Sequence, residues 1–302
     1  METDTCSNAM LYSSKYFIAI TAHNPLNRFD PLLTVLRGYE ELPGQKEVFI
    51  FIDNEHGADK DTLFHLISSN VKGLLVDIIV APAEYTDFYL TWSHKDLLKS
   101  AVKARAYDFY IYSENDMLLS SENFFYWYSW KDRLKQLNLE PGFCRFERFG
   151  DKFVPFDNHW KWRLNGPTRE VWGERPFKVD TYLTPAAEFI GFASLGNPYT
   201  GMMILDQEMA EEYIDSDSCD PVKSFPLTKY RCWPIADRST MGTIFENLNP
   251  GQEHRRVVPL VSTNGSVQIA PCGLVEHLDD KYSKALSDKG EDLLDISEFL
   301  VA

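Results

Sequence analysis

The strongest chemical signal in the sequence is the acidic triplet Glu114-Asn115-Asp116. It follows a continuously apolar stretch, residues 109–112, which predicts a buried strand. Two acids at positions i and i+2 beyond such a strand can both reach a divalent ion that bridges a diphosphate. That ion would stabilise the negative charge that a departing nucleoside diphosphate gains. A solvated acidic loop is the alternative interpretation of the same residues.

Polar side chains also follow the first two predicted strands. Thr21, His23 and Arg28 come after the first strand, and Asp53 ends the second. Open α/β sheets bind ligands at the carboxyl ends of their strands, so these residues are candidates for contacts to a nucleotide. Each of them is equally compatible with an ordinary turn at a strand end.

Two further candidates begin a predicted helix. The segment Ser93-His94-Lys95-Asp96 has the Ser-x-x-Asp form of a capping box and precedes a helical pattern of apolar residues. His94 and Lys95 would then meet a phosphate through side-chain charge and the unpaired N–H groups of the helix start. A solvated helix start is the alternative.

The elements that must position these residues alternate along the first half of the chain. Apolar runs predict strands, and apolar residues at helical spacing predict helices between them. The predicted strands cover residues 16–20, 48–52, 74–80 and 109–112, and the predicted helices cover 31–39, 62–68 and a segment from 93 onward. This alternation favours an α/β fold with a mainly parallel sheet and helices on both faces.

From about residue 124 the composition changes, because tryptophans fall among scattered prolines and glycines. We expect one domain over residues 15–302, with a nucleotide-sugar-binding half at 15–125 and an acceptor-binding half at 126–302. Residues 1–14 look like a tag or a disordered leader.

Residues 15–125 resemble the nucleotide-binding half of GT-A glycosyltransferases. The resemblance lies in the order of these elements, in the Ser-His-Lys helix and in the strand that leads into Glu114-Asn115-Asp116. The resemblance implies a GT-A-like fold and a DxD-like motif in which Asp116 binds Mn²⁺ or Mg²⁺. Glu114 would contact ribose or metal-bound water. The chain departs from the motif with Glu in the first place and Asn in the middle, so the role of Glu114 is the less defined one.

Segments 197–201, 236–239 and 276–278 show a weaker likeness to some bacterial and viral GT-A-like sequences. Many enzymes of this fold return a histidine near the chain end to the same metal, and His277 is the candidate for that ligand. A surface histidine in an acidic segment is the alternative. His254 is a second candidate, but two arginines follow it and disfavour a cation.

An inverting transfer needs one carboxylate to deprotonate the acceptor hydroxyl. Asp237, before a helix expected over residues 238–246, resembles in position the base of inverting GT-A enzymes. Glu188 and Asp206 compete for this role. Trp92 and Trp233 are candidates for stacking on a sugar ring.

The sequence thus predicts a transferase that moves a sugar from a nucleotide-diphospho-sugar to a glycan or small-molecule hydroxyl. A non-catalytic nucleotide-sugar or glycan-binding protein is the first alternative, and a metal-dependent nucleotidyltransferase or phosphohydrolase is the second. Neither a P-loop nor a G-x-G-x-x-G stretch is present, which weakens kinase, NTPase and dinucleotide interpretations.

Composition narrows the class further. The 302 residues carry a formal net charge of −15 and no Lys/Arg-rich run, which argues against a nucleic-acid partner. No apolar run approaches the roughly 18–20 residues of a membrane-spanning helix. The five cysteines form no C-x-x-C pair, so we expect reduced thiols and a cytoplasmic protein.

Overall fold

The computed structural model describes residues 11–155, 177–180, 189, 191–227, 233–250, 252, 254–263, 266–290, 293 and 295. The chain divides into two compact units, Met1–Ser121 with Gly201–Glu246, and Glu122–Thr200 with Asn247–Ala302. The segment Gly201–Glu246, which we expected in an acceptor half, therefore folds with the first unit. Whether the two units serve the donor and the acceptor stays a prediction.

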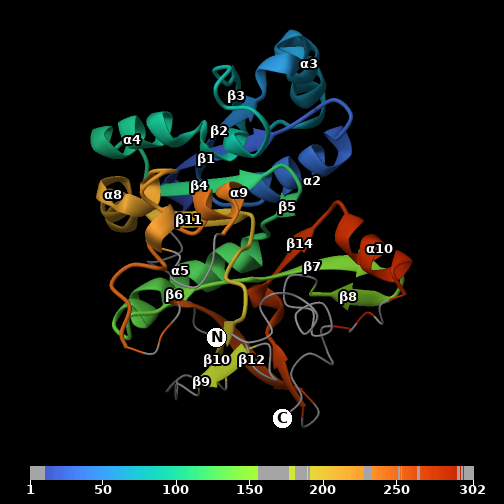
Figure 1. Cartoon of the computed structure of the whole chain (residues 1–302). Coiled ribbons are helices and arrows are strands. Elements are labelled where there is room, and N and C mark those ends of the chain that lie inside the picture. The colour runs from blue at the N-terminus through green and yellow to red at the C-terminus, as the bar shows by residue number, and fades with distance from the viewer. Residues whose placement is uncertain are drawn as a thin grey trace. The chain divides into compact units, whose positions relative to one another are not determined.

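The first unit is built on a five-stranded sheet in the order β11-β4-β1-β2-β3 (Figure 1). Strands β3, β2, β1 and β4 run parallel, and β11 pairs with β4 in the antiparallel direction. The predicted α/β fold with a mainly parallel sheet is thus confirmed. The strand bounds are β1 Lys15–Ala22, β2 Gln45–Ile52, β3 Leu75–Val80, β4 Phe109–Glu114 and β11 Met202–Asp206.

Helices cover both faces of this sheet. On one face α4 and α8 pack with alternate residues of the strands, among them Phe17, Tyr110 and Met203, in one apolar cluster. On the other face Tyr39 of α2 donates a hydrogen bond to Ser113 of β4 at 2.8 Å. The described helices of this unit are α2 Phe29–Glu40, α3 Lys60–Asn70, α4 Lys95–Ala104, α8 Gln207–Asp215 and α9 Ile235–Ser239. Its short 3-10 helices are η1 Asn54–Asp59, η2 Asp87–Trp92, η4 Asp217–Cys219 and η5 Phe225–Leu227.

The predicted capping box at the start of α4 is wrong, although a helix does begin there. His94 is the N-cap residue of α4, and no side chain caps the helix. Ser93 instead donates both its hydroxyl and its amide to the carbonyl of Leu90, because η2 runs directly into α4. Local hydrogen bonding to a preceding turn has displaced the cap that the spacing indicated.

The sheet order creates a topological switch between β1 and β4. The chain moves from β1 outward to β2 and β3, then returns to the other side of β1 to form β4. Thr21 of β1 lies in register with Glu114 of β4, and the amide of Asn115 donates to the carbonyl of Thr21 at 3.1 Å. Ligands of open α/β sheets bind where two neighbouring strands diverge in this way. The acidic triplet therefore lies at the position where open α/β sheets commonly bind ligands.

Helix α2 comes close to the chain that follows the triplet. A Cβ atom on Gly38 would lie 2.8 Å from the carbonyl oxygen of Leu119 and 2.8 Å from Cδ1 of Leu118. Such distances are too short for a real side chain, so only glycine allows this approach. Gly38 thus lets α2 support the segment that leaves the acidic triplet.

The second unit contains two further sheets, and residues of both contribute to one apolar cluster. One sheet has the order β13-β12-β10-β9, with β6 paired to β12, and the other contains β14, β7 and β8. Helix α5 (Ser121–Lys135) is bonded to this unit through Asn123, whose amide donates to the carbonyls of Cys272 and Leu274. The remaining bounds are β6 Glu140–Pro141, β7 Cys144–Phe149, β8 Lys152–Val154, β9 Phe177–Asp180, β10 Gly191–Leu195, β12 Arg256–Thr263, β13 Ser266–Ile269, β14 Leu274–His277 and α10 Lys281–Asp288.

None of the helices in the described part of the chain combines the length and apolar character that a membrane crossing needs. Three cysteines fall within the described ranges, Cys144, Cys219 and Cys272, and all three are buried thiols.

Gly38→Ala tests the close packing of α2. Alanine raises intrinsic helix propensity by about 1 kcal/mol, yet its methyl group must displace a backbone carbonyl here. We expect a net loss of about 1–3 kcal/mol in the free energy of unfolding, measured by urea denaturation. Thr34→Ala, at an exposed position of the same helix, is the control and should change stability by far less. A Gly38→Ala protein as stable as the wild type would contradict the close approach.

Candidate functional site at the carboxyl edge of the sheet

The candidate site lies where β1, β2 and β4 of the first unit end. Strand β1 leads into Thr21 and His23, β2 into Asp53, and β4 into the acidic triplet. Parallel strands bring their carboxyl ends to one edge, so residues more than 90 positions apart in sequence become neighbours there. The strand ends thus place these residues at one edge of the sheet, and that they share a ligand stays a prediction.

Asp116 is buried, with 3% of its surface exposed, and its carboxylate forms an ion pair with the side chain of Arg28. Its Oδ2 atom accepts a hydrogen bond from Nη2 of Arg28 at 2.7 Å. Arg28 immediately precedes α2. The close packing of α2 at Gly38 therefore also fixes the backbone of this arginine. A buried carboxylate needs such a partner because desolvation of an isolated charge is costly. The structure thereby joins two residues that the sequence had singled out separately.

The other members of the β1 and β4 ends are held by neutral groups. The hydroxyl of Thr21 is hydrogen-bonded to that of Tyr112 at 2.8 Å in the interior. The amide of Glu114 donates to the carbonyl of Gly201 at 2.9 Å, which ties the triplet to the start of β11. The Glu114 side chain is half-buried. The backbone of this loop is thus fixed from both sides of β4.

Asp53 lies between two imidazoles. His23 Nδ1 is 2.7 Å from its Oδ2 atom, and His56 Nδ1 is 2.6 Å from its Oδ1 atom. Asp53 also begins η1, because its side chain accepts the amide of His56 at 3.1 Å. Burial raises the pKa of Asp53, but the hydrogen bonds from His56 and the charges of His56 and His23 outweigh it, so that its pKa lies below the ordinary value. The carboxylate is therefore ionised at neutral pH.

Lys95 is in the interior of the unit rather than on a solvated helix start. Its ammonium nitrogen donates to the hydroxyl of Tyr213 and to the carbonyl of Ser239, both at 2.7 Å. The nitrogen lies 4.8–5.6 Å from the ring centres of Trp92, Tyr112 and Tyr213. Burial lowers the pKa of Lys95 to about 7. A role of Lys95 toward phosphate stays a prediction.

His94 is also fully buried. Its ring stacks on that of Tyr112 with centroids 4.1 Å apart. Burial, together with the charge of Lys95, lowers the pKa of His94 well below its ordinary value, so the imidazole is neutral. Its predicted contact to a donor stays a prediction.

In the second unit, His277 ends β14 and is buried beside a carboxylate. Its Nδ1 atom lies 2.7 Å from Oε1 of Glu147 on β7. The other oxygen of Glu147 accepts the amide of Ser283. His254, the alternative ligand, directs its Nε2 atom to the carbonyl of Leu195 at 2.7 Å, and burial lowers its pKa to about 4. Of the two histidines, only His277 has a carboxylate beside its ring among the described contacts.

The candidate bases have different surroundings. Asp237 is half-buried inside α9 rather than before a helix, and α9 ends at Ser239, earlier than expected. The predicted helix over residues 238–246 is thus wrong, because the chain forms turns after Ser239 instead. Asp206 is the N-cap of α8 and accepts the amide of Met209 at 2.8 Å, which gives it a structural role. Glu188 lies outside the described residues.

The two tryptophans also differ. Trp92 is 1% exposed, and its indole N–H donates to the carbonyl of Ile235 at 2.8 Å, so it is a core residue that anchors α9. Trp233 is partly exposed.

Sequence reasoning missed two residues that complete these groups, His56 and Glu147. His56 is three residues after Asp53, a spacing that fits a short turn beyond a strand and was the available signal. Glu147 gives no local signal, since its partner is 130 positions away.

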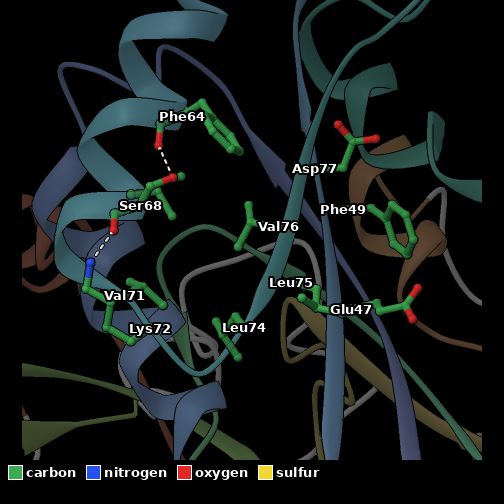
Figure 2. Close-up of a pocket in the computed structure, with 11 residues that line it drawn as sticks. Glu47, Phe49, Phe64, Ser68, Val71, Lys72, Leu74, Leu75, Val76 and Asp77 are labelled. Atoms are coloured by element: carbon green, nitrogen blue, oxygen red, sulfur yellow. Dashed lines mark hydrogen bonds between the residues drawn. The ribbon is translucent and has the colours of Figure 1, made fainter.

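A cavity of about 580 Å³ lies away from this edge. Figure 2 shows it between α3 and the first residues of β2 and β3, with Glu47 and Phe49 on one side and Phe64 on the other. The amino ends of these strands form it, so it does not belong to the acidic site.

Comparison with known proteins gives matches among solved structures alone. No family model and no curated protein matches the chain. Among solved structures, 150 chains match, and one of them is the crystal structure of S. aureus TarS. That match has a TM-score of 0.30 and 10% identity and covers 66% of this chain but only 29% of TarS. It is a distant likeness of backbone arrangement and extends to no residue role.

Lys95 provides a test of the interior charge. An amine whose pKa falls from 10.5 to about 7 on folding binds its proton more tightly in the unfolded chain. The free energy of unfolding of the wild type should therefore rise with pH relative to Lys95→Met, by up to about 1.4 kcal/mol per pH unit between roughly pH 7 and 10. Urea denaturation at several pH values measures it. Lys103→Met, at an exposed position of the same helix, is the control. A constant difference between wild type and Lys95→Met would show that the amine stays charged.

Proposed function

We propose that this protein is a metal-dependent glycosyltransferase that moves a sugar from a nucleotide-diphospho-sugar to the hydroxyl of a glycan or small molecule with inversion. The observation that carries the proposal is the buried Asp116 beyond β4, at the point where β4 and β1 diverge. α/β sheets of this kind bind ligands at this edge. Because a carboxylate and a diphosphate are both negative, Asp116 can hold a diphosphate only through a bound cation.

The residues of the first unit fit Mn²⁺ or Mg²⁺. Asp116 offers carboxylate oxygen, the donor type that both ions prefer, and its burial restricts its motion. Glu114 follows the same strand two residues earlier and is half-buried. When bound, the ion would stabilise the charge that develops on the departing nucleoside diphosphate.

Arg28 supports a diphosphate at the same place. Its side chain is 27% exposed, and its guanidinium donates to Asp116 through Nη2. Guanidinium groups bind phosphate oxygens through parallel N–H donors. We infer that Arg28 balances the carboxylate in the unliganded protein and contacts phosphate when a donor is bound.

His277 is proposed as a further ligand of the ion. Metal-binding histidines commonly donate their second ring N–H to a carboxylate, which fixes the tautomer. Glu147 occupies that position at Nδ1, which leaves Nε2 as the nitrogen able to bind an ion. Burial raises the pKa of Glu147, but the bonds from His277 and Ser283 hold it below the ordinary value, so it remains an acceptor. That His277 and Asp116 bind the same ion stays a prediction from the sequence.

Asp237 is proposed as the general base. Its half-buried position on α9 suits a carboxylate that is held by the protein yet reachable by an acceptor hydroxyl. The base would take the hydroxyl proton as the acceptor oxygen attacks the anomeric carbon.

Asp116→Asn tests the donor site. The variant keeps the size of the side chain but removes its charge, so Mn²⁺-dependent binding of nucleoside diphosphate should weaken by at least about 10- to 100-fold. Calorimetry with UDP, GDP and dTDP, with Mn²⁺ or with chelator, measures it. Asp77→Asn, the same charge change at an exposed position on β3, is the matched control and should bind normally. If Asp116→Asn keeps the metal dependence of the wild type, the triplet is a structural loop.

Asp237→Asn tests the base. Losing a general base costs on the order of 10²–10⁴ in rate and leaves donor affinity intact, because the lost interaction belongs to the transition state. Transfer of radiolabelled sugar and donor affinity are to be measured together. Near-normal turnover, or a product with the anomeric configuration of the donor, would exclude Asp237 from this role. Donor binding by the wild type without transfer to any acceptor would favour a binding protein.

A further inference from the structure

Asp53 and its two histidines form a compact group of potential metal ligands within the first unit. One ligand atom each from His23, Asp53 and His56 can be chosen so that all three lie within 4.8 Å of one another. They come from the ends of β1 and β2 and from η1, so the sheet and one helical turn fix their backbones.

The contacts inside this group leave one oxygen unsatisfied. Oδ1 of Asp53 accepts hydrogen bonds from both the amide and the ring of His56. Oδ2 is buried and accepts no hydrogen bond from the described part of the chain, although His23 Nδ1 is only 2.7 Å away. Their contact lacks the alignment of a hydrogen bond, so a neutral His23 leaves this buried oxygen without a donor. This buried oxygen is evidence for a ligand beyond the histidines' own charges.

The ligand types indicate which ion fits. Two imidazoles and one carboxylate suit borderline transition ions, with zinc as the common case, and they suit magnesium poorly. Ligand atoms around one such ion stand roughly 3.0–3.4 Å apart at bond lengths of about 2.0–2.1 Å. The present N···O contacts of 2.6 and 2.7 Å, made to different oxygens of Asp53, would have to widen by several tenths of an ångström around an ion. The His23 side chain is 59% exposed and can make that adjustment.

We propose that His23, Asp53 and His56 bind a divalent transition-metal ion of the zinc type, separate from the Mn²⁺ or Mg²⁺ expected at Asp116. Three protein ligands leave at least one coordination position open to water, so the ion is reachable from solvent on the side of His23. Asp53 thus serves as a metal ligand and not only as a contact to ribose.

Cobalt(II) is the probe, because its visible absorption reports nitrogen and oxygen ligation directly. The full-length, tag-free, chelator-treated protein is titrated with Co²⁺, and Zn²⁺ is then added in competition. We expect one Co²⁺ with a ligand-field band that Zn²⁺ abolishes. His23→Gln and His56→Gln should each weaken binding by at least about 10- to 100-fold. His23 is exposed, so its variant should fold even if His56→Gln disturbs η1.

Three controls separate this site from other histidines and acids. His65→Gln, at an exposed position of α3, should retain the band. Asp116→Asn and His277→Gln should also retain it, whatever happens to donor binding, so the two sites can fail independently. The proposal is overturned if the wild type gives no band, if His23→Gln binds Co²⁺ like the wild type, or if Asp116→Asn removes the band.

Discussion

The parallel pairing of β1 with β4 is the constraint on which the first unit depends. It sets Thr21 opposite Glu114, and one further backbone bond, from Asn115 to the Thr21 carbonyl, carries the ladder past the end of β4. That bond fixes the backbone of the acidic triplet before any side chain is considered. Arg28 can then reach Asp116 because α2 begins just after the β1 loop and packs closely at Gly38. A loop fixed in this way presents its carboxylate without further reorganisation.

Much of this arrangement could be predicted from the sequence, because buried strands in parallel sheets are continuously apolar. The runs at 16–20, 48–52, 74–80 and 109–112 correspond to β1, β2, β3 and β4, and the strands are longer than the runs except for β3, which begins one residue later. Pairwise contacts could not be predicted, since apolar periodicity gives faces and not neighbours. The Arg28–Asp116 pair joins positions 88 apart, and the antiparallel addition of β11 depends on a segment beyond residue 200. The capping box failed because a preceding 3-10 turn used the serine.

The polar residues of the first unit fall into two physical classes. At the carboxyl edge, Asp53 and Asp116 are buried carboxylates, each beside a cationic or ionisable partner. In the interior, Lys95 is surrounded by aromatic rings and bonded to Tyr213 and Ser239. Sequence position gave both classes the same appearance, a polar residue at the end of an apolar run. Only packing separates residues that are available to a ligand from residues that hold the unit together.

The position of β11 late in the sequence also affects how the first unit folds during synthesis and how it can be expressed as a fragment. The first unit is assembled from two stretches, with about 80 residues of the second unit between them in sequence. On the ribosome β4 is made long before β11, so one side of β4 stays unpaired for several seconds at ordinary elongation rates. An unpaired apolar edge can pair with other chains. A recombinant fragment that stops near residue 125 would make this transient state permanent, so soluble fragments of the first unit need the 201–246 segment joined back to it.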